Sequence, residues 1–167
     1  MKKLLVFDLD GTLIDSRADL AAAVNTVRLE NGLDVLRVEQ VKSFIGNGIR
    51  KLVERSFADV TVDISSILER YRTVYYSQSV VHTSVYPGVK SGLMQLQKAG
   101  IVSTVLTNKP GGISRSILEV LGLLPLLETV IGAEDGYALK PSSAGLRALM
   151  EEHGAHADSC WMIGDHH

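Results

Sequence analysis

The chain has 167 residues, 46% of them hydrophobic, and its 17 basic and 19 acidic side chains leave a net charge of -2. This length suits one domain or a domain with an inserted subdomain, and the apolar share is ample for a core. The charge pattern excludes a basic stripe for nucleic acid, the single cysteine excludes an internal disulfide, and no stretch could span a bilayer, so we expect a cytoplasmic protein.

The first predicted element is a buried strand, Leu4–Phe7, which is followed at once by Asp8 and Asp10. Such apolar runs are typical of parallel strands covered on both faces, and open parallel sheets bind ligands beyond the carboxyl ends of their strands. Two carboxylates so close together repel, so a divalent cation, a lysine or a raised pKa must compensate. The alternative is that both aspartates are turn residues before Gly11.

From Ser16 to about Val85 the apolar spacing predicts helices and no strand. The string Ser16-Arg17-Ala18-Asp19 predicts a capping box at the start of the first helix. Three further stretches repeat apolar residues at helical spacing: Val38–Phe44, Ile49–Phe57 and Ile64–Tyr75. We therefore expect an all-helical subdomain over residues 16–85, inserted into a core made of residues 1–15 and 86–167.

Beyond a turn at Tyr86-Pro87-Gly88, predicted helices and strands alternate. The predicted strands are Ile101–Leu106, Thr129–Gly132 and Cys160–Ile163, and the helices between them run over Val89–Ala99, Ile113–Leu121 and from Leu146 to near Gly154. This alternation predicts right-handed crossovers and an α/β fold with a Rossmann-like parallel sheet. Cys160 fits a buried apolar position.

Polar residues follow the predicted strands or lie in the adjoining loop: Asp8, Asp10, Thr107, Asn108, Lys140 and Asp165. Singly, each fits an ordinary role as a turn residue, a solvated loop lysine or a surface acid. Because parallel strands end at the same edge of a sheet, we expect these residues to face one crevice.

Four strings carry a resemblance to the haloacid dehalogenase-like hydrolases, and together they cover the chain. The string Asp8-Leu9-Asp10-Gly11-Thr12-Leu13 resembles the first signature of that family. Val105–Lys109 resembles the second, Lys140-Pro141 the third and Gly164-Asp165 the fourth.

The resemblance implies that Asp8 is the nucleophile that accepts a phosphoryl group and that Asp10 is the general acid/base. Asp10 also favours phosphate over halide as the leaving chemistry, because the dehalogenases proper lack this second acid. Hydrolysis of phosphate monoesters is very slow without a catalyst, and an aspartyl-phosphate divides it into two easier steps. An acid role for Asp10 requires surroundings that hold its proton.

The expected binding groups follow from the charge of a phosphoryl group. Thr107 and Asn108 are expected to donate hydrogen bonds to it, and Lys140 is expected to supply a positive charge and to hold the nucleophile. Hard oxygen atoms are the expected ligands of Mg²⁺: the carboxylates of Asp8 and Asp165 and the backbone carbonyl of Asp10.

The helical insert resembles the first-type cap of the family, which closes over the site and selects the substrate. Within it, Gly46-Asn47-Gly48 resembles the Gly-Asn-Gly of phosphoglycolate phosphatases. Arg50 or the amides of this turn are expected to meet a substrate carboxylate. The alternative for the turn is a simple break between helices.

The resemblance departs at the end of the chain. The fourth signature of the family is usually followed by another acid, a strand and a helix, whereas this chain ends at His167. We expect a fragment or a variant that completes its site otherwise, with an uncovered edge strand near Trp161. His166 and His167, native or the remnant of a tag, are not expected to be metal ligands.

The sequence thus predicts a magnesium-dependent phosphomonoesterase for a small anionic metabolite, 2-phosphoglycolate first, as a monomer or a homodimer. The open alternatives are a phosphatase or mutase for a sugar phosphate, a pyrophosphatase, and a catalytically inert binding module.

Overall fold

The computed structural model describes residues 3–165, and His166 and His167 lie outside the described residues. The chain divides into two compact units, which are described separately. One comprises the described residues up to Asp15 and from Ser84 onward, and the other runs from Ser16 to Thr83. Among the described residues no helix combines the length and the apolar character needed to cross a membrane.

The first unit contains a sheet of four parallel strands in the order β5-β4-β1-β6. The strands are β1 (Leu4–Phe7), β4 (Val102–Pro110), β5 (Thr129–Ala133) and β6 (Cys160–Ile163). In β1, Leu4 and Val6 are completely buried, as expected for a strand between two neighbours with helices on the sheet. The predicted Rossmann-like parallel sheet is therefore confirmed.

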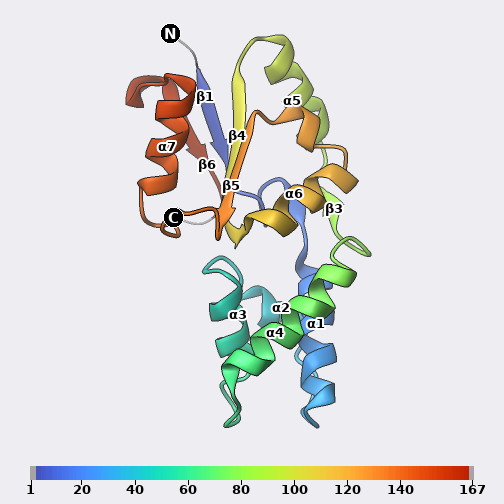
Figure 1. The fold of residues 1–167 in the computed structure, drawn as a ribbon. Helices are drawn as coiled ribbons and strands as arrows, with labels where there is room; N and C mark the ends of the chain where they lie inside the picture. The colour runs from blue at the N-terminus through green and yellow to red at the C-terminus, as the bar shows by residue number, and fades with distance from the viewer. Residues whose placement is uncertain (1–2, 166–167) are drawn as a thin grey trace. The chain divides into compact units, whose positions relative to one another are not determined.

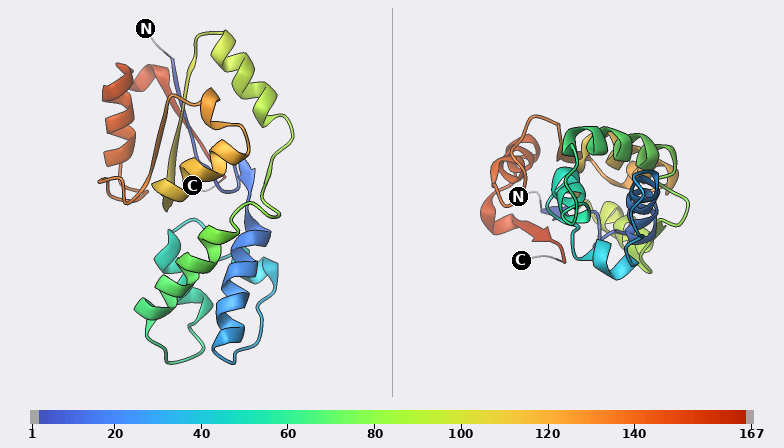
Figure 2. Two further views of the ribbon diagram at one scale, coloured as in Figure 1. Left: turned by 45° about the vertical axis from the view of Figure 1, so that its right-hand side comes forward. Right: turned by 90° about the horizontal axis from the view of Figure 1, so that it is seen from below.

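Three helices connect these strands: α5 (Val89–Lys98), α6 (Gly111–Val120) and α7 (Ala144–His153). Helix α7 covers one face of the sheet, and α5 and α6 lie on the other (Figures 1 and 2). Leu149 of α7 packs into an apolar cluster with Leu4, Val6, Leu106 and Ile131. Two short 3-10 helices, Leu124–Leu126 and Ala157–Ser159, precede β5 and β6.

Strand β6 forms one edge of the described sheet, as the sequence predicts for the region of Trp161. Its large apolar side chains are unusually accessible, with Trp161 47%, Met162 42% and Ile163 38% exposed. In the part of the chain that the structure describes, one face of β6 and its outer edge are thus accessible.

The prediction that β4 ends at Leu106 is wrong, because the strand continues to Pro110. After an irregularity in register, Pro110 pairs with Ala133 of β5, and α6 begins directly at Gly111. Thr107 and Asn108 are buried strand residues and not part of an exposed turn. Polar side chains can occupy a buried strand when the fold supplies hydrogen-bond partners for them.

A second, two-stranded sheet pairs β2 (Ile14–Asp15) with β3 (Ser84–Val85) in the antiparallel direction. The prediction of no strand up to Val85 is therefore wrong at Ser84–Val85. A strand of two residues is too short to show the alternation by which strands are recognised in a sequence.

The second unit is helical, with α1 (Arg17–Glu30), α2 (Val38–Lys42), α3 (Ile49–Ser56) and α4 (Ile64–Ser77). Helix α1 packs against α2 and α4, and the rings of Tyr71 and Tyr75 are stacked and buried. Arg28 is buried as well, and it donates hydrogen bonds to the carboxylate of Asp59 and to the backbone carbonyl of Asp34.

The predicted capping box at the start of α1 is wrong, since the side chain of Ser16 makes no capping hydrogen bond. Asp19 instead accepts hydrogen bonds from the backbone N–H groups of Val81, His82 and Thr83 and from the Thr83 hydroxyl. Burial alone would raise the pKa of Asp19, but these hydrogen bonds outweigh it and hold the pKa below its ordinary value.

We expect Asp19→Asn to destabilise the helical unit by about 2–4 kcal/mol, because three backbone donors lose a charged acceptor. Since the pKa of Asp19 is lowered by folding, its contribution is present above the ordinary Asp pKa and is lost as the pH falls through the lowered value. The difference in urea stability between the two proteins should therefore shrink below about pH 4.

The matched control is Asp63→Asn, which changes an exposed carboxylate at the N-cap of α4 and should cost little stability, because Asn caps a helix about as well as Asp. Hydrogen exchange provides the local readout, because the amides of Val81, His82 and Thr83 should lose protection in Asp19→Asn. Unchanged exchange at these three amides would contradict the assignment.

Candidate active site

Asp8 lies directly beyond the carboxyl end of β1. Its backbone N–H donates to the carbonyl of Ile163 in β6 at 2.8 Å, so the neighbouring strand fixes this residue. Its Oδ1 accepts a hydrogen bond from the N–H of Leu9 at 2.7 Å. Leu9 is completely buried, whereas the side chains of Asp8 and Asp10 on either side of it are each 14% exposed. The Asp8 carboxylate is thus presented at the edge of the sheet in a defined orientation.

Lys140 belongs to the loop between β5 and α7, and its Nζ lies 2.8 Å from Oδ2 of Asp8. The side chain of Asn108 holds the backbone of Lys140 on both sides. Its Oδ1 accepts from the N–H of Lys140 at 2.8 Å, and its Nδ2 donates to the carbonyl of Lys140 at 3.1 Å. Asn108 therefore anchors the lysine through its side chain, a contact that the sequence does not predict.

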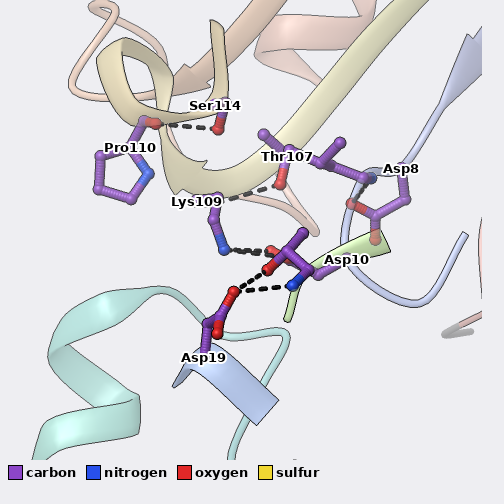
Figure 3. A network of polar contacts seen from close by, with 9 residues as sticks. Asp8, Asp10, Asp19, Thr107, Lys109, Pro110 and Ser114 are labelled. Atoms are coloured by element: carbon purple, nitrogen blue, oxygen red, sulfur yellow. Dashed lines mark hydrogen bonds and ion pairs between the residues drawn. The ribbon is translucent and has the colours of Figure 1, made fainter. Parts of the chain in front are cut away.

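Asp10 pairs with a different lysine, Lys109 of β4. The Nζ of Lys109 lies 2.9 and 3.0 Å from the two carboxylate oxygens of Asp10 (Figure 3). Thr107, also in β4, accepts a hydrogen bond at Oγ1 from the backbone N–H of Lys109 at 3.2 Å. The two aspartates thus have separate ammonium partners, contributed by a loop and by a strand.

Asp165 follows β6 and reaches the loop after β1. A β-carbon at Gly11 would overlap the carboxylate of Asp165, and Gly11 has a φ of 84°, which disfavours other residues. A β-carbon at Gly164 would lie 3.4 Å from the β-carbon of Asp8. The structure thus brings Asp8, Asp10, Lys140 and Asp165 to the edge of the sheet that is formed by the carboxyl ends of its parallel strands.

The end of β5 is fixed close to this edge. Arg115 of α6 forms a two-pronged ion pair with Asp135, and Asp135 also accepts from the N–H of Gly132 at 2.8 Å. Hydrogen bonding to Arg115 lowers the pKa of Asp135, and the same pair raises the pKa of Arg115. A β-carbon on Gly132 would lie 2.6 Å from the backbone of Lys109, so β4 and β5 approach closely here.

The four predicted substrate contacts of the helical unit lie in and just after the turn between α2 and α3. Gly46 and Gly48 have φ values of 107° and 86°, which glycine adopts readily. The Oδ1 of Asn47 accepts a hydrogen bond from Arg55 at 2.9 Å. Arg50 is exposed, with NH1 3.9 Å from a carboxylate oxygen of Glu54. Their contact with a substrate stays a prediction.

The charge of the edge can be counted from its residues. Asp8 pairs with Lys140 and Asp10 with Lys109, and the carboxylate of Asp165 lies beside Gly11, so the formal charge of these five side chains is negative. Within residues 3–165 no group of three or more His, Cys, Asp and Glu side chains is placed to hold a metal ion. The predicted ligand set uses only two carboxylates and adds a backbone carbonyl, and such hard oxygen donors suit Mg²⁺.

The sequence alone does not indicate a role for Lys109. Lysine is rarely buried, and a lysine beside polar residues usually indicates a solvated position. In the structure its side chain is 5% exposed, and burial of an ammonium group requires a charged partner. Lys109 lies in a stretch that resembles a family signature, and this was the available signal for a functional role. The sequence does not indicate which acid the lysine contacts.

Comparison with protein families gives one match over nearly the whole chain. The model described as haloacid dehalogenase-like hydrolase matches residues 5–167. The phosphoglycolate phosphatase of Pseudomonas syringae is 36% identical over 99% of this chain. That of Rhodospirillum rubrum is 38% identical, again over 99%. The chain spans 63% of the length of the first relative and 72% of the second.

Solved structures of similar proteins share the fold. The crystal structure of a predicted phosphoglycolate phosphatase from Haemophilus somnus has a TM-score of 0.93 and 28% identity, covering 98% of this chain and 77% of that one. A putative phosphoglycolate phosphatase from Lactobacillus delbrueckii has a TM-score of 0.86 and 25% identity, with 99% and 80% covered.

Proposed function

Because the chain belongs to the haloacid dehalogenase-like hydrolase family, we propose that it is a magnesium-dependent phosphomonoesterase that forms an aspartyl-phosphate. We propose 2-phosphoglycolate as the substrate, since the two curated relatives above are phosphoglycolate phosphatases. The observation that carries the reaction class is the arrangement of Asp8 and Asp10. They lie two residues apart beyond β1, each carboxylate with its own ammonium partner.

In the first half of the reaction, a carboxylate oxygen of Asp8 attacks the phosphorus atom. The bond from phosphorus to the alkoxide oxygen breaks as Asp10 gives its proton to that oxygen, and glycolate leaves. In the second half, water attacks the phosphorus of the aspartyl-phosphate while Asp10 accepts a proton from the water. The bond between Asp8 and phosphorus then breaks, which releases phosphate and restores both carboxyl groups.

The other residues of the edge act on the charge of the phosphoryl group. Lys140, 2.8 Å from Asp8, is placed to neutralise negative charge on the transferring oxygens. Thr107 and the backbone N–H of Asn108 lie within the last residues of the adjacent strand β4 and are the proposed donors to the same oxygens. The Asn108 side chain acts indirectly, because it holds the backbone of Lys140.

The donor set fits Mg²⁺, with the carboxylates of Asp8 and Asp165 and the backbone carbonyl of Asp10 as the proposed protein ligands. When bound, the ion offsets the excess negative charge of the edge and screens the phosphate from the attacking carboxylate.

We also propose that the helical unit is the cap that selects the substrate. The glycine turn and Arg50 offer backbone N–H groups and a guanidinium group, which suit the carboxylate of 2-phosphoglycolate. The proposed hinge segments are β2 and β3, which directly precede and follow the helical unit in the sequence and pair with each other.

A panel of phosphorylated metabolites with Mg²⁺ tests the proposal, with phosphate release as the readout and chelation of the metal as the control. We expect 2-phosphoglycolate to give the highest kcat/KM. Preference for hexose phosphates or pyrophosphate would contradict the substrate assignment. No turnover of any ester by the folded, metal-loaded chain would favour a binding module.

A further inference from the structure

We propose that Lys109 is a positioning residue that holds the carboxylate of Asp10 in the orientation required for its proton transfers. This inference rests on the proposed function, because it assigns a role relative to Asp10 as general acid/base. In each half of the reaction the proton moves between Asp10 and either the leaving oxygen or water.

The contact between the two side chains is symmetrical and largely buried. The ammonium group lies within 3.0 Å of both oxygens of Asp10, so rotation of the carboxylate would break a charged hydrogen bond (Figure 3). The side chains of Lys109 and Asp10 are 5% and 14% exposed, so water competes little for either group.

Lys109 lies in a rigid part of the molecule, strand β4. Its N–H is bonded to Oγ1 of Thr107, and the space beside its carbonyl is so limited that Gly132 admits no β-carbon. Asp10, in contrast, lies in a short loop. A loop residue is held accurately when a group on a rigid element fixes it.

Stability is a poor explanation for such a pair. Taking two charges out of water costs about as much free energy as their attraction returns, so apolar residues would stabilise this position equally well. Separate cations for the two acids do have a functional consequence. Lys140 holds the nucleophile, whereas Lys109 prevents the second carboxylate from turning toward the same ammonium group.

The test compares Lys109→Met with wild type on two substrates that differ in how much their leaving group needs a proton. We expect kcat/KM for 2-phosphoglycolate, an alkyl ester, to fall on the order of 100-fold. For p-nitrophenyl phosphate, whose leaving group needs little protonation, the loss should be below about tenfold, with KM unchanged. Lys109→Arg should recover activity to within about tenfold of wild type, since guanidinium also binds both carboxylate oxygens.

An equal loss on both substrates would overturn the proposal, because a merely structural role lowers both rates together. Lys98→Met removes an exposed lysine of α5 and is the matched control, with no expected change on either substrate.

A second measurement needs no activity. Lys109→Met and Asp10→Asn should each lower the melting temperature, by roughly 10 °C, because each leaves a buried charge unpaired. The double variant should melt no lower than either single variant. Additive losses would show that the two side chains are not coupled and would overturn the proposal. If wild type hydrolyses neither ester, the proposed function fails, and this cycle alone decides whether Lys109 holds Asp10.

Discussion

Asp8→Asn is expected to abolish turnover, with kcat lowered at least about 10⁴-fold, because an amide cannot form the acyl-phosphate bond on which both halves of the reaction depend. The substitution keeps the shape of the side chain, and the backbone N–H of residue 8 still bonds to Ile163. The protein should therefore stay folded. Phosphate release from 2-phosphoglycolate measures the loss, and circular dichroism checks the fold.

Trapping the intermediate makes this prediction specific. Acid-quenched wild type should carry a phosphoryl group on the peptide that contains Asp8, and Asp8→Asn should carry none. Asp158→Asn changes an exposed acid of a short 3-10 helix and is the matched control, with no expected effect. A phosphoryl group found on another residue of the active enzyme would refute the assignment of the nucleophile.

The second large effect is expected for Lys140→Ala, which should lower kcat by about 10²–10³-fold through the loss of one preorganised cation at the phosphoryl group. The fold should survive, since Asn108 holds Lys140 by its backbone and not by its side chain. The measurements are steady-state kinetics and thermal unfolding.

Rescue by added methylammonium would show that the charge itself is missing. Lys98→Ala, on an exposed part of α5, is the matched control for the loss of a lysine. Activity of Lys140→Ala equal to wild type would remove this residue from the site.

Local sequence patterns predict the parallel sheet of the core and most of its helices. An apolar run of four residues was enough to predict β1, and glycine or proline marked the ends of the helix at Val89–Lys98. The acids that follow β1 and β6 could be expected at one edge, because parallel strands in such units all end on the same side. These inferences need only the spacing of residues along the chain.

Spacing along the chain was therefore sufficient for the order in which the parallel strands and their connecting helices follow one another, and for the acids that follow β1 and β6. Three features depend on the folded chain as a whole: the continuation of β4 to Pro110, the bonding of Asp19 to residues 81–83 and the pairing of Lys109 with Asp10. The physical reason is the same in each case. A buried polar group must find a partner, and that partner is far away in the sequence, where no periodic pattern reveals it.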